Sequence, residues 1–434
     1  MTERRVVLAE YFTMSDSTLL FVVRAEFDEP RVIEIDISVE QIQEFAVANF
    51  SGERGRRNIS NLDEDEWQEK FGCLVDPLSE WAEPEDIIWF VPHDAIHYLP
   101  LHALRLEGDY LMERNPVCYS PSASVMRYCH SKRKGRRKNA LILADSRADR
   151  PLWYAREQAL GIGSLPGLEA EIYLGSKATK TLVKRKLAEE RGNVDIFHFA
   201  CHGYFDPHQA LKSGIMLAPE EEEEAAHLAV DGGNRWNLTA EEIFGLEMQA
   251  DLVTLSACES GVNERRTGDE LIGLTRALIY AGTPSVAVSL WAVDELSTDI
   301  LMMKFYEFLL DGERNKVDAL RESQRYLRRI TMAQAIEYIE QIRERPEHDT
   351  RAAAYFHLTV AEIRLAARDY AAAVKDFQIL KERPDLEGEV MNRTRVGLAQ
   401  ANFGLKSDTK ANYSRPLYDR PYFWAPFIIV GDWK

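Results

Sequence analysis

Two apolar runs of similar design, residues 194–200 and 251–257, constrain the fold of this chain more than any other stretch. Both consist largely of β-branched, aliphatic and aromatic residues, and a glycine follows each within a few positions. Near-continuous runs of this kind are typical of strands buried on both faces of a parallel sheet. The first run leads to His202 and the second to Cys258. Because open α/β sheets gather functional residues at the carboxyl ends of their strands, we expect this imidazole and thiol to meet there.

An imidazole beside a thiol is suited to nucleophilic catalysis. Histidine has a pKa near neutrality, so it can accept the thiol proton and leave a nucleophilic thiolate. His202 precedes Cys258 by 56 positions. The backbone N–H groups of Gly203 and Cys258 are candidates for stabilising a tetrahedral oxyanion. Cys201 is interpreted as a buried neighbour that faces the opposite way, because side chains alternate along a strand.

Charge and cysteine usage exclude several classes of protein. The net charge of −18 over 434 residues disfavours binding to nucleic acid, which needs a basic surface. The five cysteines are an odd number without CxxC pairs, which indicates reduced thiols in the cytoplasm. The first residues lack a signal-peptide pattern, and no window approaches about 18 consecutive apolar residues, so we expect no membrane span.

Two motifs outside the opening runs allow a functional and a structural interpretation. His93 and His97 have the i, i+4 spacing of zinc ligands on a helix, but Asp94 stands where such motifs carry Glu. Prolines at 92 and 100 leave room for scarcely two helical turns. We therefore favour a packed loop and predict no metal and no cofactor. The basic run 131–138 is interpreted as a solvated connecting loop instead of a nucleic-acid site.

The remaining pattern predicts how the chain is organised. Strands predicted at 87–91, 140–144 and 284–290 alternate with helices, which indicates a mostly parallel α/β sheet. A wholly helical region contains two similar segments, 335–346 and 373–384, which lie 38 positions apart. Their Ala, aromatic and Pro positions resemble a tetratricopeptide unit, whose period is about 34 residues.

We therefore predict four parts of the chain. They are a β-hairpin and helical extension at 1–80, an α/β core at 81–330, a tetratricopeptide-like helical insertion at 331–410, and a strand at 411–434 that returns to the core.

Seven phrases of the sequence resemble the CHAT peptidases, a caspase-like family often joined to tetratricopeptide repeats. They are VPHDAIHYLPLHAL at 91–104, YSPSASV at 119–125, HFACHG at 198–203, ADLVTLSACESG at 250–261, GLTRAL at 273–278, VAVSLW at 286–291, and WAPF with GDW within 424–433. The resemblance implies a caspase-like α/β/α sandwich with a mostly parallel central sheet, to which this chain adds the N-terminal β-rich extension and the small tetratricopeptide-like helical insertion. It also implies a His202–Cys258 dyad.

The chain departs from the family pattern in two ways. Tetratricopeptide repeats commonly precede the peptidase as a long array, whereas a short piece follows the dyad here. The loop at 261–268 also has fewer glycines than the family suggests and carries Arg265 and Arg266. That loop is either processed or regulated, or an ordinary solvated turn.

The resemblance predicts a cytoplasmic, caspase-like cysteine endopeptidase that cleaves a specific protein partner. By analogy it acts in bacterial signalling or defence under an activating protein. Glu259 and Asp294 are candidates for an acidic pocket that binds a basic side chain, or else are solvated or hydrogen-bonded acids at loop ends. The alternative is a non-catalytic interaction scaffold. We expect no membrane or nucleic-acid partner, and the oligomeric state stays open.

Overall fold

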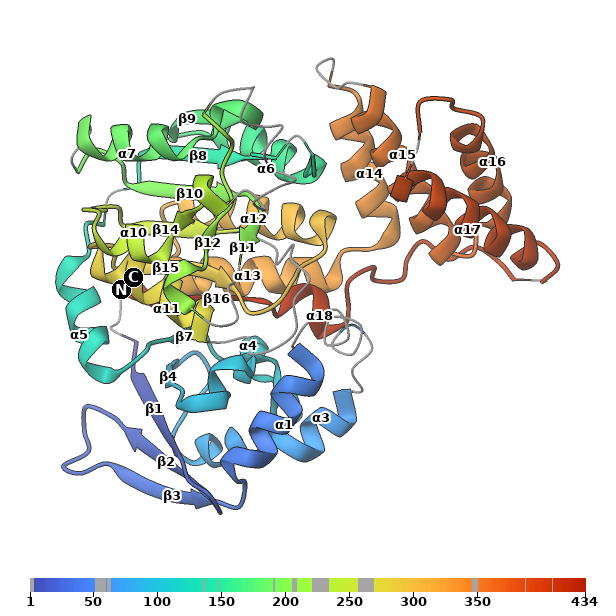
Figure 1. The fold of residues 1–434 in the computed structure, drawn as a ribbon. Helices are drawn as coiled ribbons and strands as arrows, with labels where there is room; N and C mark the ends of the chain where they lie inside the picture. Colours follow the sequence, from blue (N-terminus) through green and yellow to red (C-terminus); the bar gives the residue numbers. More distant parts are fainter. Residues whose placement is uncertain are drawn as a thin grey trace. The chain divides into compact units, whose positions relative to one another are not determined.

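The computed structural model describes residues 4–434 except 51–59, 61–63, 136, 148, 190–191, 205–208, 221–233, 257–268, 346–349, 387 and 408. The chain divides into two compact units, which are traced in Figure 1. Unit 1 comprises Met1–Arg325 and Pro421–Lys434, and unit 2 comprises Tyr326–Arg420.

The core of unit 1 is a large sheet, which in the described residues has 11 strands in the order β3-β2-β1-β4-β7-β16-β15-β14-β10-β8-β9. Its strands are β1 (Val6–Thr13), β2 (Thr18–Val23), β3 (Arg31–Ile35), β4 (Ile87–Val91), β7 (Val117–Tyr119), β8 (Asn139–Ala144), β9 (Glu169–Leu174), β10 (Ile196–Ala200), β14 (Leu252–Leu255), β15 (Ser285–Ser289) and β16 (Phe427–Gly431). Smaller sheets join β5 (Arg105–Leu106) with β6 (Asp109–Tyr110), and β11 (Gly203–Tyr204), β12 (Gly214–Ile215) and β13 (Leu238–Thr239).

The direction of the strands changes at the centre of the large sheet. β16 pairs antiparallel with β15 and parallel with β7. On the β15 side, β14, β10, β8 and β9 are successively parallel. On the other side, β7, β4 and β1 are parallel, and β2 and β3 complete an antiparallel edge. β4 and β10 therefore run in opposite directions, and their carboxyl ends lie on opposite sides of the sheet, where the strands end.

Helices cover both faces of this sheet. His198 on β10 and Thr254 on β14 are hydrogen-bonded to Tyr306 of α12 (Glu295–Leu310), which packs beside α6 (Trp153–Gly163). On the opposite face, Val288 of β15 lines a small pocket with Thr275 of α11 (Asp269–Tyr280). The prediction of an α/β fold with a mostly parallel sheet is confirmed.

The other helices of unit 1 connect these strands. They are α1 (Val39–Phe50), α3 (Glu64–Phe71), α4 (Leu111–Arg114), α5 (Ala123–Lys132), α7 (Lys180–Glu189), α10 (Ala240–Phe244) and α18 (Pro421–Trp424), together with the start of α13 (Lys316–Arg329).

A cluster of buried charges lies at the edge of the sheet where β14 begins and β16 ends. Asp251 precedes β14, Asp432 follows β16, and both side chains are fully buried. The Lys316 Nζ, also fully buried, lies 3.0 Å from Asp251 Oδ2 and 3.6 Å from Asp432 Oδ2. It also donates to Ser285 Oγ at 2.8 Å. One ammonium thus links two strands and the start of a helix.

Two arginines of the basic run complete this cluster. Arg137 Nε donates to Asp251 at 3.0 Å, and Arg133 Nε donates to Asp432 at 2.7 Å. The interpretation of residues 131–138 as a solvated loop is therefore wrong for these two side chains. The physical reason is that two buried carboxylates need more positive charge than Lys316 alone supplies.

The cluster shifts the pKa values of its members. Burial raises the pKa of the Asp251 carboxyl, but Lys316 and Arg137 outweigh burial and hold this pKa below its ordinary value. Burial lowers the pKa of Lys316, and Asp251 opposes that shift. The charged forms are therefore stable only as a set.

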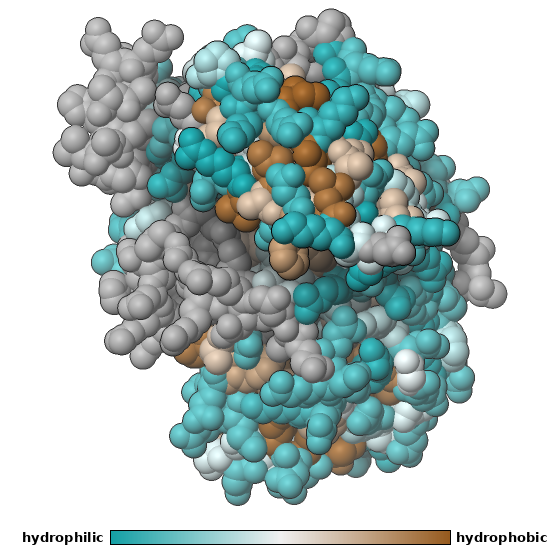
Figure 2. Space-filling model, turned by 90° about the vertical axis from the view of Figure 1, so that its right-hand side faces the viewer, coloured by the Kyte–Doolittle hydropathy of each residue, from teal (hydrophilic) through white to brown (hydrophobic). Residues whose placement is uncertain are grey.

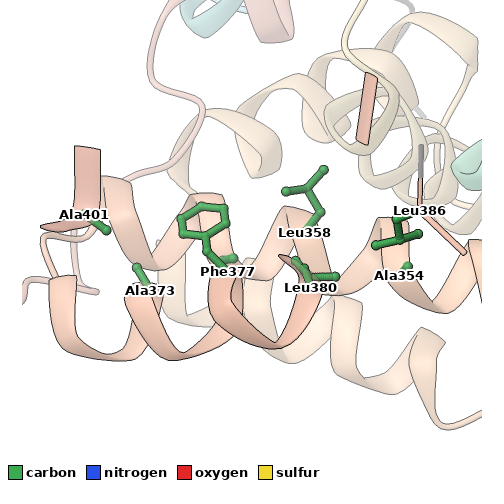
Figure 3. Close-up of a cluster of buried hydrophobic side chains, with 8 residues drawn as sticks. Ala354, Leu358, Ala373, Phe377, Leu380, Leu386 and Ala401 are labelled. Carbon is green, nitrogen blue, oxygen red and sulfur yellow. The ribbon is translucent and has the colours of Figure 1, made fainter. Parts of the chain in front are cut away.

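Unit 2 is helical and contains α14 (Met332–Arg343), α15 (Thr350–Ala366), α16 (Tyr370–Lys381) and α17 (Gly388–Gly404). Alanines and larger apolar residues from α15, α16 and α17 form its buried core, shown in Figure 3. Glycines allow close packing: a Cβ on Gly397 would lie 2.3 Å from the Phe377 ring. Small residues facing aromatic ones are typical of tetratricopeptide-like helix pairs. No helix in the described ranges of either unit is long and apolar enough to span a membrane.

We expect the substitution Lys316→Met to lower the free energy of unfolding by about 3 kcal/mol, because it leaves buried carboxylates short of a cation. Urea denaturation of the full chain measures this loss. The matched control is Lys304→Met, which removes a partly exposed pair with Glu307 and should cost at most about 1 kcal/mol. Equal stabilities of the two variants would show that the buried ammonium is dispensable.

Candidate active site

The two apolar runs of the sequence are neighbouring strands. β10 and β14 pair in parallel, with Phe199 opposite Leu255. Their carboxyl ends therefore meet at one edge of the sheet, as the sequence predicts. His202 lies two residues beyond β10, whereas Cys258 and Glu259 lie outside the described residues.

The backbone around His202 is fixed by a small sheet. Gly203 begins β11 and pairs with Ile215 of β12. The His202 carbonyl accepts a hydrogen bond from the Met216 N–H at 2.8 Å. Both His202 and Gly203 are buried. The predicted oxyanion residue Gly203 is therefore held directly beside the predicted base.

One ring nitrogen of His202 has its partner and the other has none among the described residues. Nε2 lies 2.7 Å from the carbonyl oxygen of Arg150. Because a carbonyl only accepts, Nε2 carries the proton in this bond. Nδ1 is buried and lacks a hydrogen-bond partner in the described part of the chain. This tautomer leaves the Nδ1 lone pair available to take a proton.

The surroundings of His202 favour its neutral form. Burial lowers the pKa of the imidazole, and the positive charges of Arg150 and Arg147 lower it further. The bond to the Arg150 carbonyl and the Asp149 carboxylate act in the opposite direction without reversing the shift. At neutral pH the ring is therefore unprotonated, which is the state a general base requires.

Cys201 lacks the properties of a nucleophilic thiol. It is buried, and its Sγ lies 3.5 Å from the Leu143 carbonyl. Burial raises the pKa of this thiol to about 12. Cys201 therefore stays protonated at neutral pH and is a poor nucleophile.

Asp294 lies at the same edge of the sheet but already has a structural role. It is the N-cap of α12, and its Oδ1 accepts from the Ser297 N–H at 2.9 Å. Trp291, nearby, is buried and donates from Nε1 to the Tyr422 carbonyl at 3.0 Å. A substrate-binding role for Asp294 and Glu259 stays a prediction.

The three histidines after β4 have separate surroundings. The Nδ1 of His93 accepts from the Thr13 N–H at 3.2 Å, and His102 lies 2.9 Å from the Tyr119 hydroxyl. Burial lowers the pKa values of His97 and His102 to about 4. The segment Asp94–Tyr98 is a 3₁₀ helix, in which i and i+4 do not share a face. Across the described residues, no group of three or more His, Cys, Asp and Glu side chains is placed to hold a metal ion.

Sequence reasoning missed the loop between β8 and α6. This loop supplies the Arg150 carbonyl and also contains Arg147, whose charge acts on His202. A signal was present, because the loop follows the strand predicted at 140–144, and β8 pairs in parallel with β10. The rule that sites collect at the carboxyl ends of parallel strands points to it.

The family model for the CHAT domain matches residues 71–432. The chain belongs to the CHAT domain family. CHAT is a caspase-like domain found with tetratricopeptide repeat proteins, so the family predicted from the seven phrases is confirmed.

Two curated relatives share part of this CHAT sequence. Tetratricopeptide repeat protein 28 of Homo sapiens is 26% identical over 238 residues, which cover 49% of this chain and 9% of the human protein. Tetratricopeptide repeat protein 28 of Mus musculus is 28% identical over 195 residues, which cover 38% of this chain and 8% of the mouse protein. The chain thus spans less than a tenth of the length of these relatives.

A chain of the Saccharomyces cerevisiae separase–securin complex has a similar structure. Its TM-score is 0.50 at 10% sequence identity, and the match covers 74% of this chain and 29% of that chain. At this identity, the likeness shows a shared fold.

We expect His202 to titrate below its ordinary pKa of 6.5, because burial and two nearby arginines oppose its protonation. NMR of the imidazole ring in a Cys258→Ala variant measures the midpoint, and His202→Gln assigns the signal. A midpoint at or above 6.5 would contradict the described surroundings.

Proposed function

We propose that this CHAT protein is a cysteine endopeptidase that cleaves a specific protein partner, with His202 and Cys258 as its catalytic residues. The observation that carries the proposal is the state of His202. Its Nε2 is held by the Arg150 carbonyl while its buried Nδ1 has no partner among the described residues. An unpaired buried nitrogen costs free energy, and a thiol donating to it would remove that cost.

The position of the second strand supports the same assignment. β14 ends at Leu255, three positions before Cys258, and it pairs with the strand that leads to His202. The chain between Leu255 and Cys258 is too short to carry the thiol far from this edge, because a residue spans at most about 3.6 Å.

The proposed reaction uses the unprotonated imidazole. His202 Nδ1 takes the proton of the Cys258 thiol, and the thiolate attacks the scissile carbonyl. Backbone N–H groups of Gly203 and Cys258 stabilise the oxyanion. The imidazolium then protonates the leaving amine, an acyl-enzyme remains, and water activated by His202 hydrolyses the thioester.

We further propose a cytoplasmic setting in bacterial signalling or defence, with an activating protein. Support for a reducing compartment comes from the cysteines. Within the described residues Cys73, Cys118, Cys129 and Cys201 are all free thiols, and most of them are buried.

A second candidate, a non-catalytic scaffold, is favoured by the surface of unit 2. Val396 and Phe403 lie on one side of α17, and Phe403 is 77% exposed. Figure 2 shows apolar residues grouped among hydrophilic ones on one face of the molecule. Large exposed apolar side chains often mark contact sites for another protein.

We expect a thiol-reactive peptide ketone to label Cys258 in lysate from cells that naturally express the chain, which supplies any activator. His202→Gln should slow labelling by roughly 10²–10⁴-fold, because it removes the base. Peptide mapping by mass spectrometry measures the rate.

Cys201→Ser is the matched control for this experiment and should label at the wild-type rate, because its thiol is buried and protonated. Labelling that is unchanged by both His202→Gln and Cys258→Ala would favour the scaffold over the peptidase.

A further inference from the structure

Arg147 is a buried arginine in the loop between β8 and α6. Its side chain is 4% exposed. Nε and Nη2 form a bidentate pair with the Asp149 carboxylate, at 2.8 and 2.9 Å. Nη1 is also buried, yet it has no hydrogen-bond partner among the described residues. Two of the three guanidinium nitrogens are therefore hydrogen-bonded, and the third is not.

An unpaired guanidinium nitrogen is unusual in a protein interior. Buried polar groups are nearly always hydrogen-bonded, and leaving a donor unpaired costs about 1–3 kcal/mol, more when the group is charged. A purely structural arginine at this position would gain by solvation of Nη1. A ligand that accepts a hydrogen bond from Nη1 would remove this cost.

Hydrogen bonds attach the loop that carries Arg147 beside His202. The Asp145 N–H donates to the Ala200 carbonyl at 3.1 Å, and Ser146 Oγ donates to the Met216 carbonyl at 2.6 Å. Three residues after Arg147, the Arg150 carbonyl receives the His202 Nε2–H. The guanidinium is thus fixed on the same loop that orients the proposed base.

The loop carries two arginines, Arg147 and Arg150, and two acids, Asp145 and Asp149, of which Asp145 is paired with Arg156 of α6. Arg150 and Arg147 both act on His202, whereas Asp149 is the acid that opposes them. The Asp149 carboxylate is already engaged by the Arg147 fork. An anionic group that reached Arg147 would find Nη1, a charged N–H donor without a hydrogen-bond partner among the described residues.

We propose that Arg147 Nη1 binds a carboxylate side chain of the substrate next to the scissile bond, which makes Arg147 a specificity-determining residue. This proposal rests on the proposed peptidase function. A substrate without the carboxylate would bury Nη1 unpaired, so discrimination arises from the cost of that unpaired donor.

This assignment is opposite in charge to the preference that Glu259 and Asp294 suggest from the sequence. Asp294 caps α12 with its carboxylate, which leaves it less available to a basic side chain. One experiment therefore decides between an acidic and a basic substrate residue.

The test uses the full chain in activating lysate and a set of peptide ketones that react with Cys258. The peptides are identical except for Asp, Asn, Arg or Leu at the residue before the reactive ketone. We expect the Asp peptide to label the wild type at least about tenfold faster than its neutral isostere Asn. Arg147→Met should remove this ratio, and Arg147→Lys should keep part of it.

The control for loss of charge is Arg185→Met, which removes an exposed arginine of α7 and should leave the Asp-to-Asn ratio unchanged. Thermal unfolding of each variant tests for damage to the fold. The ratio between two peptides is insensitive to the amount of folded protein, so a merely structural role of Arg147 would slow both peptides equally and overturn the proposal.

Faster labelling by the Arg or Leu peptide would also overturn it. If no peptide labels Cys258 above the Cys258→Ala background, the peptidase function itself fails, and the role of Arg147 fails with it.

Discussion

The buried ammonium of Lys316 is the interaction on which the arrangement of unit 1 most depends. Its two acidic partners belong to strands of opposite direction, one at the start of β14 and one past the end of β16. Without cations, Asp251 and Asp432 would be two buried carboxylates at one sheet edge. Three cations neutralise these carboxylates, namely Lys316, Arg133 and Arg137. Their ion pairs connect α13, the sheet and the segment that follows α5.

This cluster lies at the edge of the sheet opposite to His202. The amino end of β14 is occupied by paired charges, while its carboxyl end leads to the proposed nucleophile. The two edges differ in how their polar groups are satisfied. The charges at one edge bond to one another, whereas His202 Nδ1 and Arg147 Nη1 at the other edge are unpaired in the described residues. The buried charge cluster and the candidate active site are thus separated by the length of the strands.

The sequence predicts the side chains of the candidate site better than the backbone groups that hold them. His202 is recognisable because an apolar run ends beside it, and the parallel pairing of β10 with β14 follows from the composition of both runs. The Arg150 carbonyl has no such signature, because any residue presents a carbonyl. The direction of β16 cannot be predicted from the sequence either, because its apolar residues suit a parallel or an antiparallel orientation between β7 and β15. Asp294 could have been recognised as a helix cap from its position before α12.

The central position of β16 also sets an order of folding. Every other strand of the large sheet precedes unit 2 in the sequence, and β16 follows it. The residues of the block ending in β7 and of the block beginning with β15 are therefore all synthesised before the strand that joins the two blocks. This last strand of the large sheet pairs with both β7 and β15 and brings Asp432 to Lys316. Such late, long-range closure is slow relative to local helix formation. Residues near His202 can thus be in place before the two halves of the sheet are joined into one.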